Sequence, residues 1–173
     1  MIYAHIYIKT HILIKKMNLR NQQKGTTLIE VLVSVVVIAI GLLGIAALQG
    51  HSTRYNHSAH LRSIAISQVN NMVDRMYANL EGVEAGHYNN ITGIPPDPNC
   101  TTCTLSQIAQ QDTNQWNTTN AQLLPSGQGT VTVNGNRHII TLRWDGNRTG
   151  ATGTGCSGNA AIDLSCFIME VQL

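Results

Sequence analysis

The sequence predicts an α+β fold in which one long N-terminal helix, first transmembrane and then amphipathic, packs on a small antiparallel β-sheet. Three observations carry this prediction. Residues 31–48 form an uncharged apolar run, residues 51–80 repeat apolar side chains at helical spacing, and residues 130–173 contain alternating segments separated by turns. The 173 residues are enough for one domain, and only 12% of them are charged, about half the share in a typical soluble protein.

Residues 1–25 read as a leader that is separate from the fold. No acidic residue precedes Glu30, and the leader contains five basic residues, Lys9, Lys15, Lys16, Arg20 and Lys24. By the positive-inside rule this end is cytoplasmic, and the chain beyond Gln49 is exported. Met17 begins the compact basic segment MNLRNQQKG, so we expect translation to start there and residues 1–16 to be an upstream extension.

The apolar run predicts the transmembrane half of the helix, residues 26–50. A bilayer core about 30 Å thick needs about 20 apolar residues at the helical rise. A secretory signal would be shorter and followed by a small-residue cleavage site, whereas this chain continues with helical character. Glu30 interrupts the run. A carboxylate inside a membrane helix costs about 3 kcal/mol, so Glu30 either lies at headgroup level or meets a cationic partner.

The segment KGTTLIE, residues 24–30, resembles the processing site of type IV pilins and pseudopilins. In that family a basic leader ends in Gly, a prepilin peptidase cleaves after it, and a Glu lies five residues into the mature chain. The resemblance implies cleavage between Gly25 and Thr26, N-methylation of Thr26, and contact of Glu30 with the Thr26 amine of a neighbouring subunit. Thr26 departs from the family pattern, in which Phe is usual.

The resemblance extends to IGLLGIAALQ, residues 40–49, which is similar to minor pilins of the PilV type, the type IV pilus modification proteins. It implies a pilin fold and a role in type IV pilus assembly, within the fibre or its initiating tip complex. The implied partners are other minor and major pilins, prepilin peptidase, the inner-membrane assembly platform and membrane lipid. The implied location is the inner membrane, crossed once with the head in the periplasm, and then the cell-surface pilus.

Two other functions remain open. One is a minor pseudopilin of type II secretion, which belongs to the same family. The other is a single-pass, membrane-anchored exported binding domain that never polymerises. An anchored domain needs neither a cleavage site nor a buried carboxylate, so residues 25–30 favour the pilin-like functions. Neighbouring genes would separate a pilus from a secretion system.

Residues 51–80 predict that the helix, which starts at Thr27, continues as an amphipathic segment to about Asn79. Glu81-Gly82, just beyond it, is the expected end signal. No Pro or Gly interrupts residues 51–81. Apolar residues three and four positions apart share one helix face, which we expect to pack on the head, residues 81–173. The members of this stripe are Ala65, Val69, Met72, Val73, Met76 and Leu80.

In the head, residues 84–103 are rich in Gly, Asn and Pro and predict an irregular loop. Residues 104–124 predict a helix capped by Thr104, with Leu105, Ile108, Ala109, Asp112 and Trp116 at helical spacing. Residues 130–134 and 137–144 predict a β-hairpin, and residues 163–173 a last strand. A three- or four-stranded antiparallel sheet follows from these segments.

Four cysteines in an exported chain predict two disulfides, for which three pairings exist. The short spacings favour Cys100 with Cys103 and Cys156 with Cys166. The sequence CTTC also fits a redox motif. That motif requires its first Cys at a helix N-terminus in a βαβ unit, whereas here a Pro-rich loop precedes it.

No motif indicates catalysis, so we expect no enzyme activity, no cofactor and no metal site. The histidines His51, His57 and His60 have no Cys or carboxylate at ligand spacing and read as solvated or interfacial residues. The scattered Asp112, Asp145 and Asp163 read as turn and cap residues. Beyond the leader, six arginines and nine acidic residues give a net charge near −3, which does not predict nucleic-acid binding.

Overall fold

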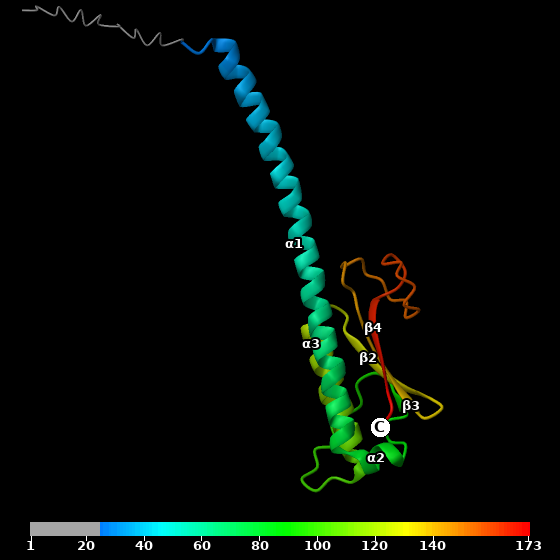
Figure 1. The fold of residues 1–173 in the computed structure, drawn as a ribbon. Coiled ribbons are helices and arrows are strands. Elements are labelled where there is room, and N and C mark those ends of the chain that lie inside the picture. The colour runs from blue at the N-terminus through cyan, green and yellow to red at the C-terminus, as the bar shows by residue number, and fades with distance from the viewer. Residues whose placement is uncertain (1–24) are drawn as a thin grey trace, which may run out of the picture. The chain divides into compact units, whose positions relative to one another are not determined.

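The structure, a computed structural model, describes residues 25–173, and it confirms an α+β fold with a long N-terminal helix and a small antiparallel sheet (Figure 1). Its elements are, in order, α1 (Leu28–Ala78), α2 (Leu80–Glu84), β1 (Asn90–Ile91), α3 (Leu105–Leu123), β2 (Gln128–Asn134), β3 (Arg137–Trp144) and β4 (Ser165–Val171). The chain divides into two units, Met1–Ile45 and Ala46–Leu173. The second is called the globular unit below.

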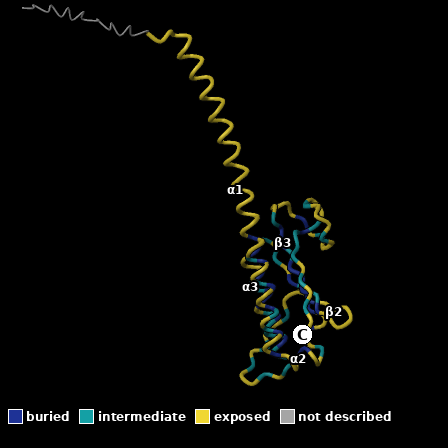
Figure 2. The backbone as a smooth tube through the Cα atoms, in the orientation of Figure 1, coloured by how far each residue is buried: buried dark blue, intermediate teal, exposed yellow. Residues whose placement is uncertain are grey.

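In the first unit, α1 is exposed on all sides over the apolar run (Figure 2). Leu28 is 79% exposed and Leu43 72% exposed, although both side chains are fully apolar. By length and composition α1 could cross a membrane, and it is the one helix among residues 25–173 that could. A continuous apolar surface of this extent is unfavourable in water, so this part of α1 requires lipid or other apolar helices around it.

In the globular unit, α1 buries one face. The buried residues recur every three or four positions, and they are Leu61, Ala65, Val69, Met72 and Met76. Val73 packs half-buried beside them. The predicted stripe is therefore confirmed from Ala65 to Met76. The assignment of Leu80 to this stripe is wrong, because Leu80 lies beyond the end of α1 and is 40% exposed.

Asn79 separates α1 from α2 by directing its side chain inward. Its amide Nδ2 donates to the Tyr88 hydroxyl and to the Leu105 carbonyl, both at 3.1 Å. The backbone at Asn79 is non-helical, with φ −125° and ψ 52°. The long helix therefore ends within one residue of the predicted Asn79, whereas Glu81-Gly82 lies inside α2 and is wrong as the end signal. Gly82 serves packing instead, since a Cβ at that position would collide with the Asn79 amide.

Asp112 joins α3 to α1 through a partly buried ion pair, so its prediction as a turn or cap residue is wrong. Its carboxylate accepts hydrogen bonds from the Arg75 guanidinium at 2.9 Å and from the Tyr88 hydroxyl at 2.6 Å. Burial and the hydrogen bond to Asp112 raise the pKa of Tyr88 above its ordinary value. Tyr88 therefore remains a neutral donor, and the half-buried Asp112 carboxylate is paired with a cation.

Helix α3 begins with a capping box, which confirms Thr104 as the cap. The Thr104 hydroxyl accepts from the Gln107 backbone N–H at 3.3 Å, and the Gln107 side chain accepts from the Thr104 N–H at 3.0 Å. The helix ends at Leu123, within one residue of the prediction. Leu105 and Ile108 from the predicted apolar face are only half-buried.

Polar side chains occupy much of the buried face of α3. Asn117 accepts from the Gly129 N–H at 2.7 Å and donates to the Gly129 carbonyl at 3.0 Å and the Gly93 carbonyl at 2.6 Å. Strand β1 pairs with β2 only at Thr132 and Val131, so Gly129 lies beyond its reach. The Asn117 amide takes the place of a backbone partner there, which a count of apolar residues does not reveal.

The four strands pair antiparallel in the order β1-β2-β3-β4. The predicted hairpin is confirmed as β2 and β3, with Asn134 opposite Arg137 and Gly135 in the turn at φ +63°. The predicted last strand is confirmed as β4. Strand β1 lies inside the predicted loop 84–103, and its two residues are too few to show an alternating pattern.

One hydrophobic core joins the buried face of α1, helix α3 and the sheet. Trp116 is fully buried in it, and its indole N–H donates to the Gln68 carbonyl of α1 at 2.8 Å. A Cβ at Gly129 of β2 would collide with the Trp116 ring. Trp116 therefore contacts both α1 and the sheet, and the absence of a side chain at Gly129 makes room for its ring.

Candidate functional site

The candidate site is the segment from Gly25 to Glu30, where the described chain begins. Gly25, Thr26 and Thr27 precede the first turn of α1 and are exposed. A Cβ placed on Gly25 would have no described atom within 4 Å beyond its chain neighbours. The Gly25–Thr26 bond is thus exposed and lies outside the helix. The predictions for the rest of the leader, including a start at Met17, lie outside the described residues.

Thr27 precedes the first residue of α1, within one residue of the predicted start, and its side chain caps the helix, a role that the sequence reasoning missed. Its hydroxyl accepts from the Glu30 backbone N–H at 3.3 Å, and its carbonyl accepts from the same N–H at 3.0 Å. Thr27 and Glu30 have the spacing of a capping box, a signal that is visible in the sequence. Ser34 then donates its hydroxyl to the Glu30 carbonyl at 2.7 Å. The backbone of Glu30 is therefore fixed in the first turn.

The Glu30 carboxylate has no cationic partner among residues 25–173. The two ion pairs there join Arg75 to Asp112 and Arg137 to Glu170. The next basic side chain of the helix is Arg54, 24 positions further on, which is about 36 Å at the helical rise. A residue of the same helix cannot neutralise Glu30 across that distance. Within residues 25–173 the Glu30 carboxylate is therefore unpaired.

Residues 20–46 match the family model of the prokaryotic N-terminal methylation motif. The chain carries a pilin-type methylation motif. The match contains the Gly25–Thr26 bond, Glu30 and most of the exposed apolar run. No curated protein and no solved structure matches the chain significantly.

The methylation motif supports a role like that of a type IV pilin or pseudopilin. It implies processing by a prepilin peptidase and association with other pilins, and proteins of this kind are structural rather than typically enzymatic. The long apolar helix followed by a small antiparallel sheet agrees with a pilin fold. One apolar helix near the N-terminus fits a membrane-anchored pilin.

The four cysteines all lie in the globular unit. Cys100 is joined to Cys103 in the loop before α3, and Cys156 is joined to Cys166, which ties the loop after β3 to β4. The Cα atoms are 5.4 Å apart in the first pair and 5.7 Å apart in the second. Helix α3 connects antiparallel strands and begins after Cys103, so the setting of a redox CxxC motif is absent from this part of the structure.

We predict that the protein contains both disulfides and that Cys156–Cys166 contributes more stability. Its loop of 10 residues gives about 2.7 kcal/mol by loop closure, against about 1.6 kcal/mol for the loop of 3 residues at Cys100–Cys103. Urea unfolding of the two double Cys→Ser variants measures this difference. Peptide mapping without reductant should recover the same pairs, and a Cys103–Cys166 peptide would contradict them.

The three histidines of α1, His51, His57 and His60, are exposed. Among residues 25–173 no group of three or more His, Cys, Asp or Glu side chains lies close enough to hold a metal ion. Asp145 and Asp163 each accept backbone N–H groups in the loop between β3 and β4, which confirms them as turn residues.

Proposed function

We propose that this protein is a minor pilin of the PilV type that takes part in type IV pilus assembly. The observation that carries the proposal is the position of Gly25–Glu30 at the start of an exposed apolar helix. The methylation motif at residues 20–46 and the α+β globular unit with four paired cysteines support it. None of these features requires chemistry at a pocket.

The proposed sequence of events begins with a precursor that crosses the inner membrane once through residues 26–50, with its head in the periplasm. Prepilin peptidase cleaves the Gly25–Thr26 bond and N-methylates Thr26. The inner-membrane assembly platform then moves the subunit into the fibre or its tip complex. There the Glu30 carboxylate meets the Thr26 amine of a neighbouring pilin, which supplies the cation that its own helix lacks.

A minor pseudopilin of type II secretion would share the processing steps and the helix contacts. Recovery of this protein from sheared surface pili supports the pilus, whereas its absence there together with loss of protein secretion in a deletion strain supports the pseudopilin. A membrane-anchored binding domain would keep its leader residues or lose them at another bond. Processing at Thr26 therefore tests the proposal most directly.

The mature protein is expected to begin at Thr26. Glycine at the cleaved position has no side chain to obstruct a peptidase, so Gly25→Val should leave the leader attached. Mass spectrometry of the membrane fraction reads both the first residue and an added methyl group. Gly50→Ala is a matched control, because no described atom lies within 4 Å of a Cβ there. A mature chain that retains Lys24, or one that begins after Gly50, would contradict the proposal.

A further inference from the structure

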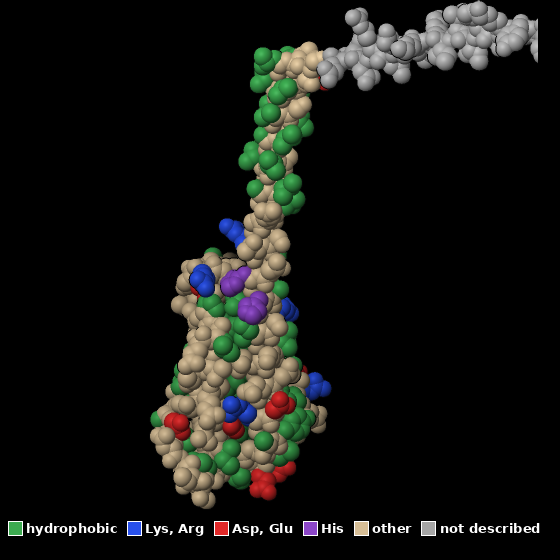
Figure 3. All heavy atoms as spheres, turned by 90° about the vertical axis from the view of Figure 1, so that its left-hand side faces the viewer, with side chains coloured by type: hydrophobic (Ala, Val, Ile, Leu, Met, Phe, Trp, Pro, Cys, Tyr) green, Lys and Arg blue, Asp and Glu red, His purple; other side chains and the backbone are tan. Residues whose placement is uncertain are grey.

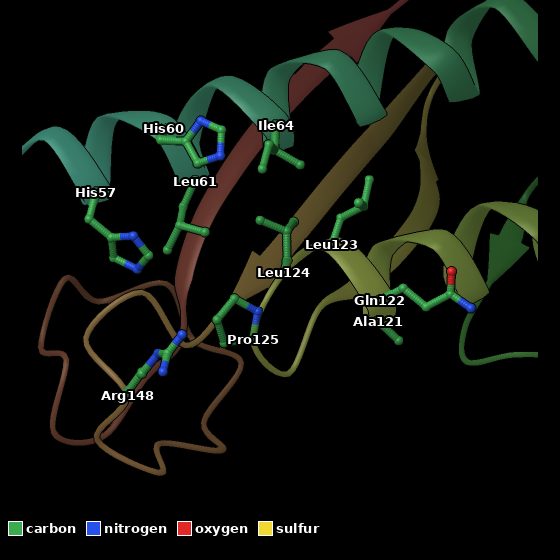
Figure 4. A pocket seen from close by; sticks show the side chains of 10 residues that line it. All are labelled: His57, His60, Leu61, Ile64, Ala121, Gln122, Leu123, Leu124, Pro125 and Arg148. Atoms are coloured by element: carbon green, nitrogen blue, oxygen red, sulfur yellow. The ribbon is translucent and has the colours of Figure 1, made fainter.

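A hollow of the globular unit is lined by basic side chains from two segments far apart in the sequence. Helix α1 contributes Arg54, His57 and His60, and the loop after β3 contributes Arg148. The two parts of this hollow, about 420 and 630 Å³, share His57 and Arg148. All four residues are exposed. Figure 4 shows His57 and Arg148 pointing toward each other, one from the helix and one from the loop. We call these four residues the cationic hollow.

The Arg148 loop is held by hydrogen bonds before any ligand arrives. Arg148 has φ +53°, and its N–H donates to the Asp145 carbonyl at 3.3 Å. The Asp145 carboxylate accepts from the N–H groups of Thr149 at 3.0 Å and Gly150 at 2.8 Å. The Asp145 N–H in turn donates to the Pro125 carbonyl at 2.7 Å, beyond the end of α3. A fixed loop loses little entropy when it binds a ligand.

Acidic side chains do not neutralise the cationic hollow. No Asp or Glu occurs between Glu30 and Asp74. Neither ion pair in residues 25–173 involves Arg54 or Arg148, and the nearby Asp145 carboxylate is occupied by backbone donors. Figure 3 shows His and Arg side chains together at one end of the globular unit, while most acidic side chains on that face lie at the other end. The cationic hollow therefore favours an anionic ligand.

The position of Arg54 along α1 indicates where that anion comes from. Arg54 follows Gln49, the end of the apolar run, by five residues, which is about 7.5 Å along the helix. With the apolar run in the bilayer, as the proposed function requires, this distance corresponds to the headgroup layer, about 5–7 Å thick on each side. Guanidinium groups bind phosphate oxygens through paired N–H donors. The first anions within reach are therefore lipid phosphates.

We propose that the cationic hollow binds the phosphate of an anionic phospholipid on the exported side of the membrane. The two arginines hold the phosphate oxygens, and His57 and His60 add N–H donors at the helix side. The loop between β3 and β4 thereby acts as a second membrane contact, in addition to the apolar helix. This contact is a property of the anchored precursor and precedes fibre assembly.

Native mass spectrometry of the full chain, released from detergent micelles that contain phosphatidylglycerol or phosphatidylcholine, tests this proposal. The unaltered protein should retain phosphatidylglycerol in preference to phosphatidylcholine. Because each arginine near an anionic membrane surface contributes about fivefold, Arg148→Gln should lower retention about fivefold and Arg54→Gln with Arg148→Gln about thirtyfold. Arg137→Gln is the control, since Arg137 is an exposed arginine of β3 outside the hollow.

Equal retention of the two lipids by the unaltered protein would overturn the proposal, as would an equal loss in Arg137→Gln and Arg148→Gln. Displacement of phosphatidylglycerol by millimolar inorganic phosphate would overturn the assignment to lipid. An unchanged thermal transition in the same micelles shows that each variant is folded. Cleavage at Thr26 and recovery in pili are measured separately, so a failure of the proposed pilus function is distinguishable from a failure of lipid binding.

Discussion

Replacement of Glu30 by valine is expected to remove this protein almost completely from sheared pili while leaving cleavage and membrane insertion intact. In the proposed precursor the carboxylate would lie near the leaflet boundary, where water can reach it. Among packed helices an unpaired charge costs several kcal/mol, and within residues 25–173 nothing pairs with Glu30. Without the carboxylate, an incoming subunit has no charged contact that fixes its axial position. Immunoblots of the pilus and membrane fractions measure the effect.

Glu30→Gln is the matched variant, because it separates the charge from the start of the helix. Gln retains the length of Glu and the hydrogen bond from the backbone N–H at position 30 to the Thr27 hydroxyl, but it cannot pair with an amine as an anion. We expect Glu30→Gln to reduce incorporation nearly as much as Glu30→Val. Normal incorporation of both variants would mean that Glu30 is a headgroup-level residue with no part in assembly.

Replacement of Trp116 by alanine is expected to lower the free energy of unfolding of the globular unit by about 3–5 kcal/mol. The fully buried indole contacts the core from α3, donates to the Gln68 carbonyl at 2.8 Å and fills the space above Gly129. Alanine would leave a cavity between α1 and the sheet. Urea unfolding of the full chain in detergent, followed by near-ultraviolet circular dichroism, measures the loss.

Tyr55→Ala is the control for this result, because Tyr55 is an aromatic residue of α1 that is 74% exposed. Its removal should change stability by less than about 0.5 kcal/mol. Gly129→Ala should destabilise the same site from the other side, since its Cβ collides with the Trp116 ring. If Trp116→Ala costs no more than Tyr55→Ala, the core does not depend on this ring.

The fold was predictable wherever a side-chain period was long enough to be seen. The apolar run, the stripe from Ala65 to Met76 and the β2–β3 hairpin all follow such periods. Asn79 and Asp112 were not predictable, because each is fixed by hydrogen bonds to Tyr88, a residue brought close only by folding. Local patterns carry no information about such partners.

The candidate site and the cationic hollow were predictable to different degrees. Residues 24–30 form a contiguous segment, so the sequence displays Gly25, Thr26 and Glu30 at their required spacing. The cap at Thr27 was also visible but was not used. The cationic hollow was not predictable, because Arg148 and His57 are far apart in the sequence. They line the same hollow only because the Asp145 turn holds the Arg148 loop beside α1.

Under the proposed function, the aliphatic surface of α1, exposed from Leu28 to Leu48, would set the free energy of transfer between membrane and fibre. Lipid tails and neighbouring apolar helices are nearly equivalent surroundings for Val, Ile and Leu, so the exchange has little hydrophobic driving force in either direction. Such a surface permits reversible polymerisation. In the proposed fibre, an ionic contact at Glu30 would then be enough to fix the axial step of each subunit.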